Sequence, residues 1–208
     1  MNYFAKFGDF QFDVLREVGN IGAGHAATAL SKLIQKEIDM NVPKVSVIPF
    51  DEVADCVGGS EAIVVTVYLR VEGDCPGNMF FILDMESARS LLRQMTGADK
   101  DVYEWTDFEY SALHEIGNIL TGSYLSSLAD FTNLSMQPSV PALAIDMAGA
   151  ILSHGLIELG HTGDVALTID TAFFEGNDRV KGHFFLIPDP DSLKTLFDSL
   201  GVPFDGDH

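Results

Sequence analysis

The chain contains little of the chemistry that supports disulfide scaffolds or metal motifs. Its 208 residues include only two cysteines, Cys56 and Cys75. They lie too far apart in sequence to form a C-x-x-C metal or redox site. Two isolated cysteines also argue against a disulfide framework, so we expect two free thiols in a reducing compartment.

Positive charge is scarce as well. Lys and Arg together number 12 against 31 Asp and Glu, which gives a formal net charge of -19 and a pI near 4.3. A surface this acidic repels nucleic-acid phosphates and anionic lipid headgroups. We therefore expect no nucleic-acid partner, and the simplest consequence of the charge is solubility.

Long uninterrupted hydrophobic runs are missing. The first twelve residues lack the basic end and apolar run of a secretory signal. The most apolar stretch, residues 142–159, contains Asp146, His154 and Glu158. A charged residue near the centre of a membrane helix costs roughly 2.5–3.5 kcal/mol on insertion scales. We expect no membrane insertion and a cytoplasmic location.

What the chain does contain is a duplicated motif, Glu-x-x-Asn followed by Pro after 22 intervening residues. The first copy is Glu17, Asn20 and Pro43, and the second is Glu115, Asn118 and Pro141. Every member of the second copy lies 98 positions after its counterpart in the first. Repetition at a fixed offset indicates two homologous halves, which we place at residues 10–98 and 107–201 of a single domain spanning 1–208.

Each copy has helical spacing. Asp13, Glu17 and Asn20 share one helix face, as do their counterparts Ser111, Glu115 and Asn118, because a helix has 3.6 residues per turn. Apolar Val14, Val18 and Ile21 form a neighbouring stripe that we expect to be buried. A second helix is predicted after each motif, at residues 26–36 and 123–131. Gly19 and Gly117 suggest close approach of another surface.

The remaining pattern predicts strands and C-terminal helices in each half. Strands are expected at residues 44–50, 63–71, 79–83, 165–174 and 183–187, and helices at 86–96 and 191–200. The insert after Pro141 is expected to be helical, and the seam between halves is placed at 99–105. Short turns between successive strands favour antiparallel pairing. The predicted fold is α/β (α+β), a pseudo-two-fold domain whose halves share a largely antiparallel sheet flanked by helices.

A carboxylate and a carboxamide on one exposed face can act on a partner. Glu can pair with a cation, and an Asn amide can both donate to and accept from a water molecule. That combination suits the positioning of a hydrolytic water at a surface that a partner supplies. Glu and Asn that merely solvate a helix would be the ordinary reading of one copy, but the duplicated context favours function.

The duplicated [Asp/Ser]-x-x-x-Glu-x-x-Asn with its distant Pro resembles the signature of the CheC/CheX/FliY family, phosphatases of phosphorylated CheY, the chemotaxis response regulator. The resemblance runs from about Phe10 to Gly201 and is strongest to CheC-type members, because both motif copies are intact. It implies that Asn20 and Asn118 orient the attacking water, and that Glu17 and Glu115 engage a lysine of the regulator. Asp13 and Ser111 would be accessory positions.

The resemblance also implies which cofactor and which second partner to expect. The regulator would bring its own Mg²⁺ and aspartyl phosphate, so no cofactor or metal of the chain's own is expected. Family members bind CheD, a receptor glutamine deamidase, through a helix in the second half. The matching segment here begins at Ala142, and Asp146 would make that contact, although a capping or surface role for Asp146 is an open alternative.

Other interpretations are weaker. The glycines at 19, 22 and 24 lack the preceding strand and the Lys-Ser/Thr of a phosphate-binding loop. His114 and Glu115 begin like a zinc H-E-x-x-H helix, but Asn118 replaces the second ligand. The serious competitor is a non-catalytic adaptor that binds phospho-CheY and CheD. Retention of Glu and Asn in both copies favours catalysis.

Overall fold

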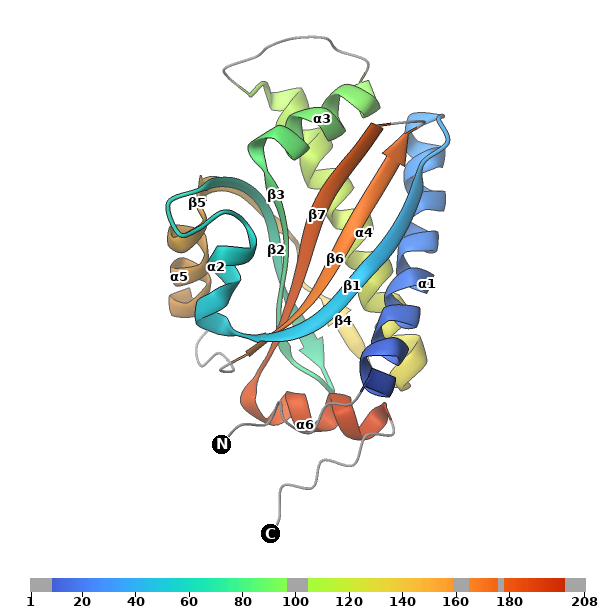
Figure 1. The fold of residues 1–208 in the computed structure, drawn as a ribbon, viewed down its shortest axis with the longest axis vertical. Coiled ribbons are helices and arrows are strands. Elements are labelled where there is room, and N and C mark those ends of the chain that lie inside the picture. Colours follow the sequence, from blue (N-terminus) through green and yellow to red (C-terminus); the bar gives the residue numbers. More distant parts are fainter. Residues whose placement is uncertain (1–8, 97–104, 159–164, 176–177, 201–208) are drawn as a thin grey trace.

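The computed structural model describes residues 9–96, 105–158, 165–175 and 178–200. A strongly curved sheet carries two long helices on one face and two shorter helices on the other, with a further helix at each end (Figure 1). The expected α/β architecture with two halves sharing an antiparallel sheet is confirmed.

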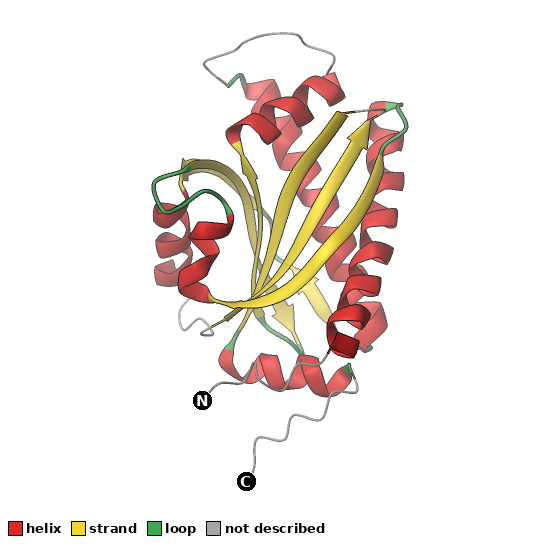
Figure 2. Ribbon diagram, in the orientation of Figure 1, coloured by secondary structure: helices red, strands yellow, loops and turns green. Residues whose placement is uncertain are grey.

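The two halves repeat a succession of a long helix, strands and a final helix (Figure 2). The first half contains α1 (Asp9–Ile34), β1 (Asp39–Pro49), the 3₁₀ turn η2 (Phe50–Glu52), α2 (Val53–Cys56), β2 (Ile63–Gly73), β3 (Gly77–Asp84) and α3 (Met85–Thr96). The second contains α4 (Asp107–Thr132), β4 (Met136–Pro138), β5 (Ala142–Met147), α5 (Ala148–Glu158), β6 (Val165–Glu175), β7 (Asp178–Pro188) and α6 (Pro190–Ser199). All five predicted strands and both C-terminal helices are confirmed, with ends displaced by up to five residues.

The sheet exchanges strands between the halves. Its order is β1-β6-β7-β3-β2-β4, and β5 also pairs with β2. All these pairs are antiparallel. β1 of the first half lies beside β6 of the second, whereas β4 and β5 of the second lie beside β2 of the first. Because β3 and β7 meet at the centre, neither half could form this sheet alone.

The central strands are apolar because both sheet faces are covered. On β3, Met79, Phe81 and Leu83 join the core beneath α1 and α4. The alternating residues Phe80 and Ile82 join a second core beneath α2 and α5. A short apolar run without hydrophobic–polar alternation is therefore a strand buried on both sides.

Each motif lies on one uninterrupted helix of 26 residues, so the prediction of a separate second helix after each motif is wrong. The glycines at 19, 22 and 24 are helical. At Gly22 a Cβ would lie 3.1 Å from the Cα of Tyr124, so α1 and α4 pack closely at this point. Tertiary packing outweighs the helix penalty of glycine, which is about 1 kcal/mol per residue.

The same crossing changes which residues of α1 are buried. Ile21, expected in the buried stripe, is 43% exposed, whereas Gly22 and Ala23 are buried instead. Leu120, the counterpart of Gly22, is fully buried in the core. This difference between the two motif copies therefore lies in helix packing and not on the exposed face.

The insert after Pro141 is only partly helical. Residues 142–147 form β5, which pairs with β2 through partners such as Leu143 and Val67, and α5 begins at Ala148. Edge pairing with an existing sheet overrides the helical composition of this segment. Of the predicted seam at 99–105, residues 99–104 lie outside the described residues. Within the described ranges, no helix combines the length and the apolar character needed to cross a membrane.

Candidate functional site

In the first motif copy, Asn20 connects α1 to β1. Its Oδ1 accepts a hydrogen bond from the backbone N of Val42 at 2.9 Å, and its Nδ2 donates to the carbonyl of Arg16 at 3.0 Å. Asn20 is consequently half-buried, whereas Glu17 is exposed. The expectation that both side chains are exposed holds for Glu17 and is wrong for Asn20, because the strand leading to Pro43 returns alongside the helix.

In the second motif copy, Glu115 and Asn118 are both exposed on α4. No described residue forms a hydrogen bond with the Asn118 carboxamide. The link to the strand is made instead by His114, whose Nε2 lies 3.0 Å from the carbonyl oxygen of Pro141. The two copies therefore place the same residue types on equivalent helices but tie them to the neighbouring strand differently.

The distant prolines mark breaks in the strands that pass the motif helices. The pairing of β1 with β6 shifts register between Asn41 and Lys44, around Pro43. In the second half the strand pairing is interrupted between the end of β4 and the start of β5, at residues 139–141, which include Pro141. Proline cannot donate a ladder hydrogen bond, so it belongs at such irregularities. The fixed Asn-to-Pro distance is the signal by which the contacts at Val42 and Pro141 could have been found.

Gly19 and Gly117 both face the molecule's own sheet. A Cβ on Gly19 would lie 3.3 Å from a methyl group of Val42, and one on Gly117 would lie 2.3 Å from a methyl group of Val67. A surface does approach these glycines closely, as expected, and it is the strand beneath the helix.

The accessory positions have local partners. Asp13 forms an exposed ion pair with Arg16 at 2.9 Å, one turn before Asn20. Ser111 donates its hydroxyl to the carbonyl of Asp107 at 2.8 Å. Both side chains are exposed, and each lies four residues before the Glu of its copy, on the same helix face.

Asp146 lies away from the two motif copies, at the end of β5. It is exposed, and its Oδ1 accepts a hydrogen bond from the backbone N of Met147 at 2.7 Å. It lies in β5, two residues before α5 begins, rather than within a helix as expected, because β5 occupies the first part of the insert.

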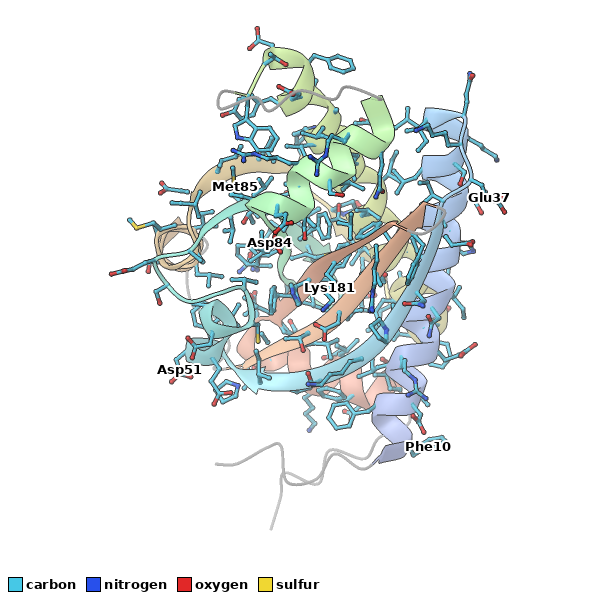
Figure 3. All side chains as sticks on the ribbon, turned by 45° about the horizontal axis from the view of Figure 1, so that its top comes forward. Phe10, Glu37, Asp51, Asp84, Met85 and Lys181 are labelled. Carbon is cyan, nitrogen blue, oxygen red and sulfur yellow. The ribbon has the colours of Figure 1, made fainter. Side chains whose placement is uncertain are left out.

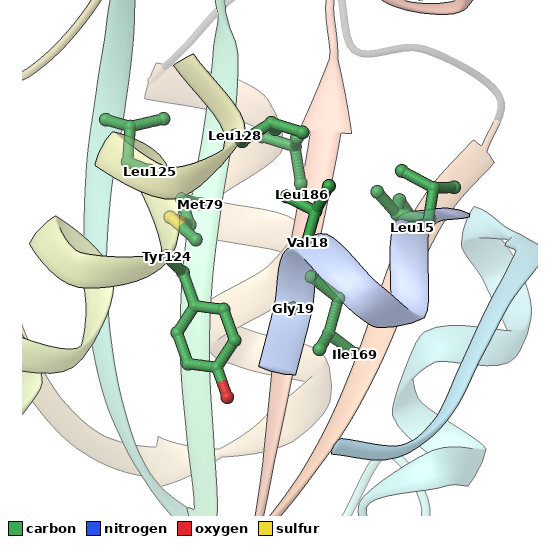
Figure 4. Close-up of a pocket in the computed structure, with 10 residues that line it drawn as sticks. Leu15, Val18, Gly19, Met79, Tyr124, Leu125, Leu128, Ile169 and Leu186 are labelled. Carbon is green, nitrogen blue, oxygen red and sulfur yellow. The ribbon is translucent and has the colours of Figure 1, made fainter. Parts of the chain in front are cut away.

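An interior cavity beneath the motif helices is apolar and offers no charged side chain for chemistry. A void of about 20 Å³ lies between α1, α4 and the sheet, lined by apolar side chains such as Val18, Met79 and Leu125 (Figure 4). That volume is close to the minimum for a single water, and apolar voids stay dry. Among the described residues, no group of three or more His, Cys, Asp or Glu side chains is placed to hold a metal ion.

Both cysteines are free thiols, as expected. Burial raises the pKa of Cys75 to about 11, and partial burial also raises the pKa of Cys56. Because the thiolate is the nucleophilic form of cysteine, neither residue is primed for covalent catalysis near neutral pH. The two Glu–Asn pairs on the motif helices, of which only Asn20 is half-buried, are therefore the candidate site.

Comparison with known proteins agrees with this geometry. The model of the CheC-like family matches residues 10–47 and 108–145, two ranges that are themselves 98 positions apart. The chain is 45% identical over 207 residues to the CheY-P phosphatase CheC of Bacillus subtilis, covering 97% of this chain and 99% of that protein. It is 24% identical to a putative CheY-P phosphatase, CheC1, of Halobacterium salinarum, covering 91% and 96% of the two chains.

Solved structures share the fold at low sequence identity. Thermotoga maritima FliY superposes with a TM-score of 0.73 at 20% identity, covering 94% of this chain and 98% of that chain. The FliM middle domain of Helicobacter pylori gives a TM-score of 0.68 at 10% identity, covering 93% and 99% of the two chains. From the family match and the near-full-length relative in B. subtilis, the chain belongs to the CheC-like family.

Proposed function

We propose that this protein is a chemotaxis phosphatase that hydrolyses the aspartyl phosphate of phosphorylated CheY. The observation that carries the proposal is the pairing of an exposed Glu with an Asn on one helix face, in two copies, in a chain 45% identical to a CheY-P phosphatase. The chain would act on a phosphate held by its partner, because the Glu and Asn of each copy supply no activated nucleophile.

The Asn carboxamide would orient the attacking water. It offers a donor and an acceptor at one position, which can hold a water in line with the phosphorus while leaving its lone pair free. Asn118 is exposed and its side chain has no hydrogen bond to a described residue, so it could enter a partner's pocket directly. Asn20 would first have to leave Val42 and Arg16.

The Glu would fix the partner's orientation. Glu17 and Glu115 lie one turn before the Asn of their copy and are exposed. An exposed carboxylate can pair with a lysine beside an acidic phosphorylation pocket, and burial in the complex would strengthen that pair by lowering the local dielectric. The Mg²⁺ that neutralises the phosphoryl oxygens would arrive with the regulator, and the chain's residues would contribute positioning alone.

The test is phosphate release from pre-phosphorylated CheY. We expect the wild-type protein to accelerate release, and Asn20→Ala combined with Asn118→Ala to remove the acceleration. Gln137→Ala, another exposed carboxamide, is the matched control and should keep wild-type activity. Binding of phospho-CheY by the wild-type protein without faster release would identify the adaptor instead. Full activity in the double variant would exclude the proposed mechanism.

We also propose that the second half binds CheD through the surface at Asp146 and α5. Asp146 is exposed at the junction of β5 and α5, beside Met147, which is 43% exposed. A carboxylate next to an exposed apolar side chain suits the rim of a protein interface.

The CheD proposal is tested by calorimetry with purified CheD. Asp146→Lys should lower the affinity for CheD at least tenfold, because a reversed charge repels the cation that an acidic rim residue faces. Asp130→Lys, a charge reversal at another exposed aspartate, should leave the affinity unchanged. Equal affinity in both variants would remove Asp146 from the interface.

A further inference from the structure

Two phenylalanines project from the beginnings of the motif helices. Phe10 is the second residue of α1 and is 73% exposed, and Phe108 is the second residue of α4 and is 67% exposed. Figure 3 shows Phe10 pointing away from the body of the molecule at the end of α1. The two residues are 98 positions apart, so they belong to the duplicated pattern. A single exposed apolar side chain is common, but the same large side chain left largely uncovered by the described residues at both equivalent positions favours a role in contacting a partner.

Each of these phenylalanines lies on the face that carries the motif. Phe108 precedes Glu115 by seven residues, and Phe10 precedes Glu17 by seven. Seven residues turn a helix by about two full turns, so the two side chains lie within about 20° of each other around the axis. Phe and Glu therefore point to the same side of each helix, roughly 10 Å apart along it.

In both copies a glycine lies on the same side of the helix as the Phe and the Glu, seven residues after the Glu. Gly24 follows Glu17 by seven residues, and Gly122 follows Glu115 by seven. A Cβ at either position would meet nothing within 4 Å, unlike one at Gly19, Gly22 or Gly117. Glycine destabilises a helix interior relative to alanine, and nothing in the described chain compensates for it at these two positions. The missing side chains leave room for an external backbone to come close.

We propose that residues Phe10, Glu17 and Gly24 form one docking strip for the receiver domain of phosphorylated CheY, and that Phe108, Glu115 and Gly122 form another. The Phe side chain enters an apolar depression of the regulator, the Glu meets its lysine, and the glycine lets its backbone approach the helix. This inference rests on the proposed function, because each docking strip flanks the Asn that would reach the phosphate.

The dimensions and charge of the docking strip fit a protein partner. Fourteen residues of helix span roughly 21 Å, longer than a small metabolite and suited to one face of a small domain. An aromatic anchor beside a charged group is typical of residues that dominate binding energy. The carboxylate between the two ends calls for a basic group at the centre of the partner's contact surface.

The first test compares two double variants. Phe10→Ala with Phe108→Ala removes both anchors. Leu33→Ala with Phe131→Ala is the control, since these residues are also 98 positions apart, are 51% and 49% exposed, and lie about 160° around their helices from the Glu. Binding to CheY carrying beryllofluoride, a mimic of the acyl phosphate, is measured by calorimetry. We expect Kd to rise at least tenfold in the first variant and to stay within twofold of wild type in the control.

The second test uses Gly24→Ala with Gly122→Ala. Alanine should raise the thermal midpoint of the protein, because it favours the helix and meets no neighbour. The same variant should bind CheY several-fold more weakly and show a raised KM with little change in kcat. A more stable protein with weaker binding cannot be explained by a folding defect.

The outcomes separate this inference from the proposed function. Unchanged CheY affinity in the double variant Phe10→Ala with Phe108→Ala would overturn the docking strip and leave the proposed phosphatase activity untouched. Weaker binding of the Phe variant to CheY, with no phosphate release by the wild type, would support the docking strip and overturn catalysis. No binding of CheY by the wild-type protein would overturn both.

Discussion

The two motif copies carry the same Glu and Asn, but the Asn side chains differ in hydrogen bonding and exposure. Asn20 is held by two hydrogen bonds within the first copy, to Val42 and Arg16. Asn118 is exposed, and His114 takes over the link between its helix and the strand at Pro141. Duplication has therefore preserved the chemical groups while the local structure around them has diverged. The side chain that ties each helix to its strand determines whether the Asn carboxamide is hydrogen-bonded within the chain, as at Asn20, or exposed, as at Asn118.

The helices also differ in how tightly they lie on the sheet. A Cβ on Gly117 would overlap Val67, at 2.3 Å from one methyl group, whereas a Cβ on Gly19 would lie at 3.3 Å from Val42. The second motif helix is seated closer to its strand than the first. Its N-terminus is fixed as well, since Thr106 and Glu109 form a reciprocal capping box. The copy with the exposed Asn is thus the one whose helix lies closer to its strand.

The largest expected effect is on stability. Gly117→Ala should destabilise the protein by about 2–3 kcal/mol, because Val67 is buried and its branched side chain cannot move aside without disturbing the core. Gly19→Ala should change stability by less than about 1 kcal/mol, since a slightly tight contact offsets the gain in helix propensity. Urea unfolding of the two variants measures this difference. Equal losses would mean that the two helices are seated alike.

The second prediction concerns catalysis. Releasing Asn20 breaks two hydrogen bonds with a net value of about 1 kcal/mol each. A cost of about 2 kcal/mol leaves roughly one molecule in thirty with the first copy ready. Asn118→Ala should therefore reduce phosphate release from phospho-CheY about tenfold or more, whereas Asn20→Ala should reduce it less than twofold. Equal reductions would show that the partner supplies the free energy needed to release Asn20.

Features of this arrangement that depend on local periodicity can be predicted from the sequence, whereas features that depend on contacts between distant segments cannot. The 98-residue offset and the helical spacing locate Glu17 and Glu115 on exposed faces, because local periodicity controls side-chain direction. The apolar run at 79–83 predicts a strand because it is short and contains no polar residue. These properties depend on neighbours along the chain.

Other features depend on contacts between distant segments. Asn20 and Asn118 have nearly identical local contexts, yet only the fold brings the backbone N of Val42 to one of them. Gly22 could end a helix in isolation and instead marks the crossing with Tyr124. Residues 142–147 have a composition suited to a helix but pair with the open edge of β2. In each case a tertiary partner overrides a local preference.

The smallest expected effect separates structural from catalytic use of the same residue type. Asn20→Ala should destabilise the protein by about 1–2 kcal/mol, because it leaves the backbone N–H of Val42, a residue only 3% exposed, without its acceptor. Asn118→Ala should change stability by less than about 0.5 kcal/mol, since its side chain is exposed. For a chain of this length, 1 kcal/mol corresponds to about 2–4 °C in the thermal midpoint. Asn20→Asp keeps the acceptor for Val42 and loses only the donor to Arg16, so it should recover most of the stability. If the aspartate variant is as unstable as the alanine variant, the bond to Val42 is not what holds Asn20 in place, and the contrast between the two copies would have to rest on exposure alone.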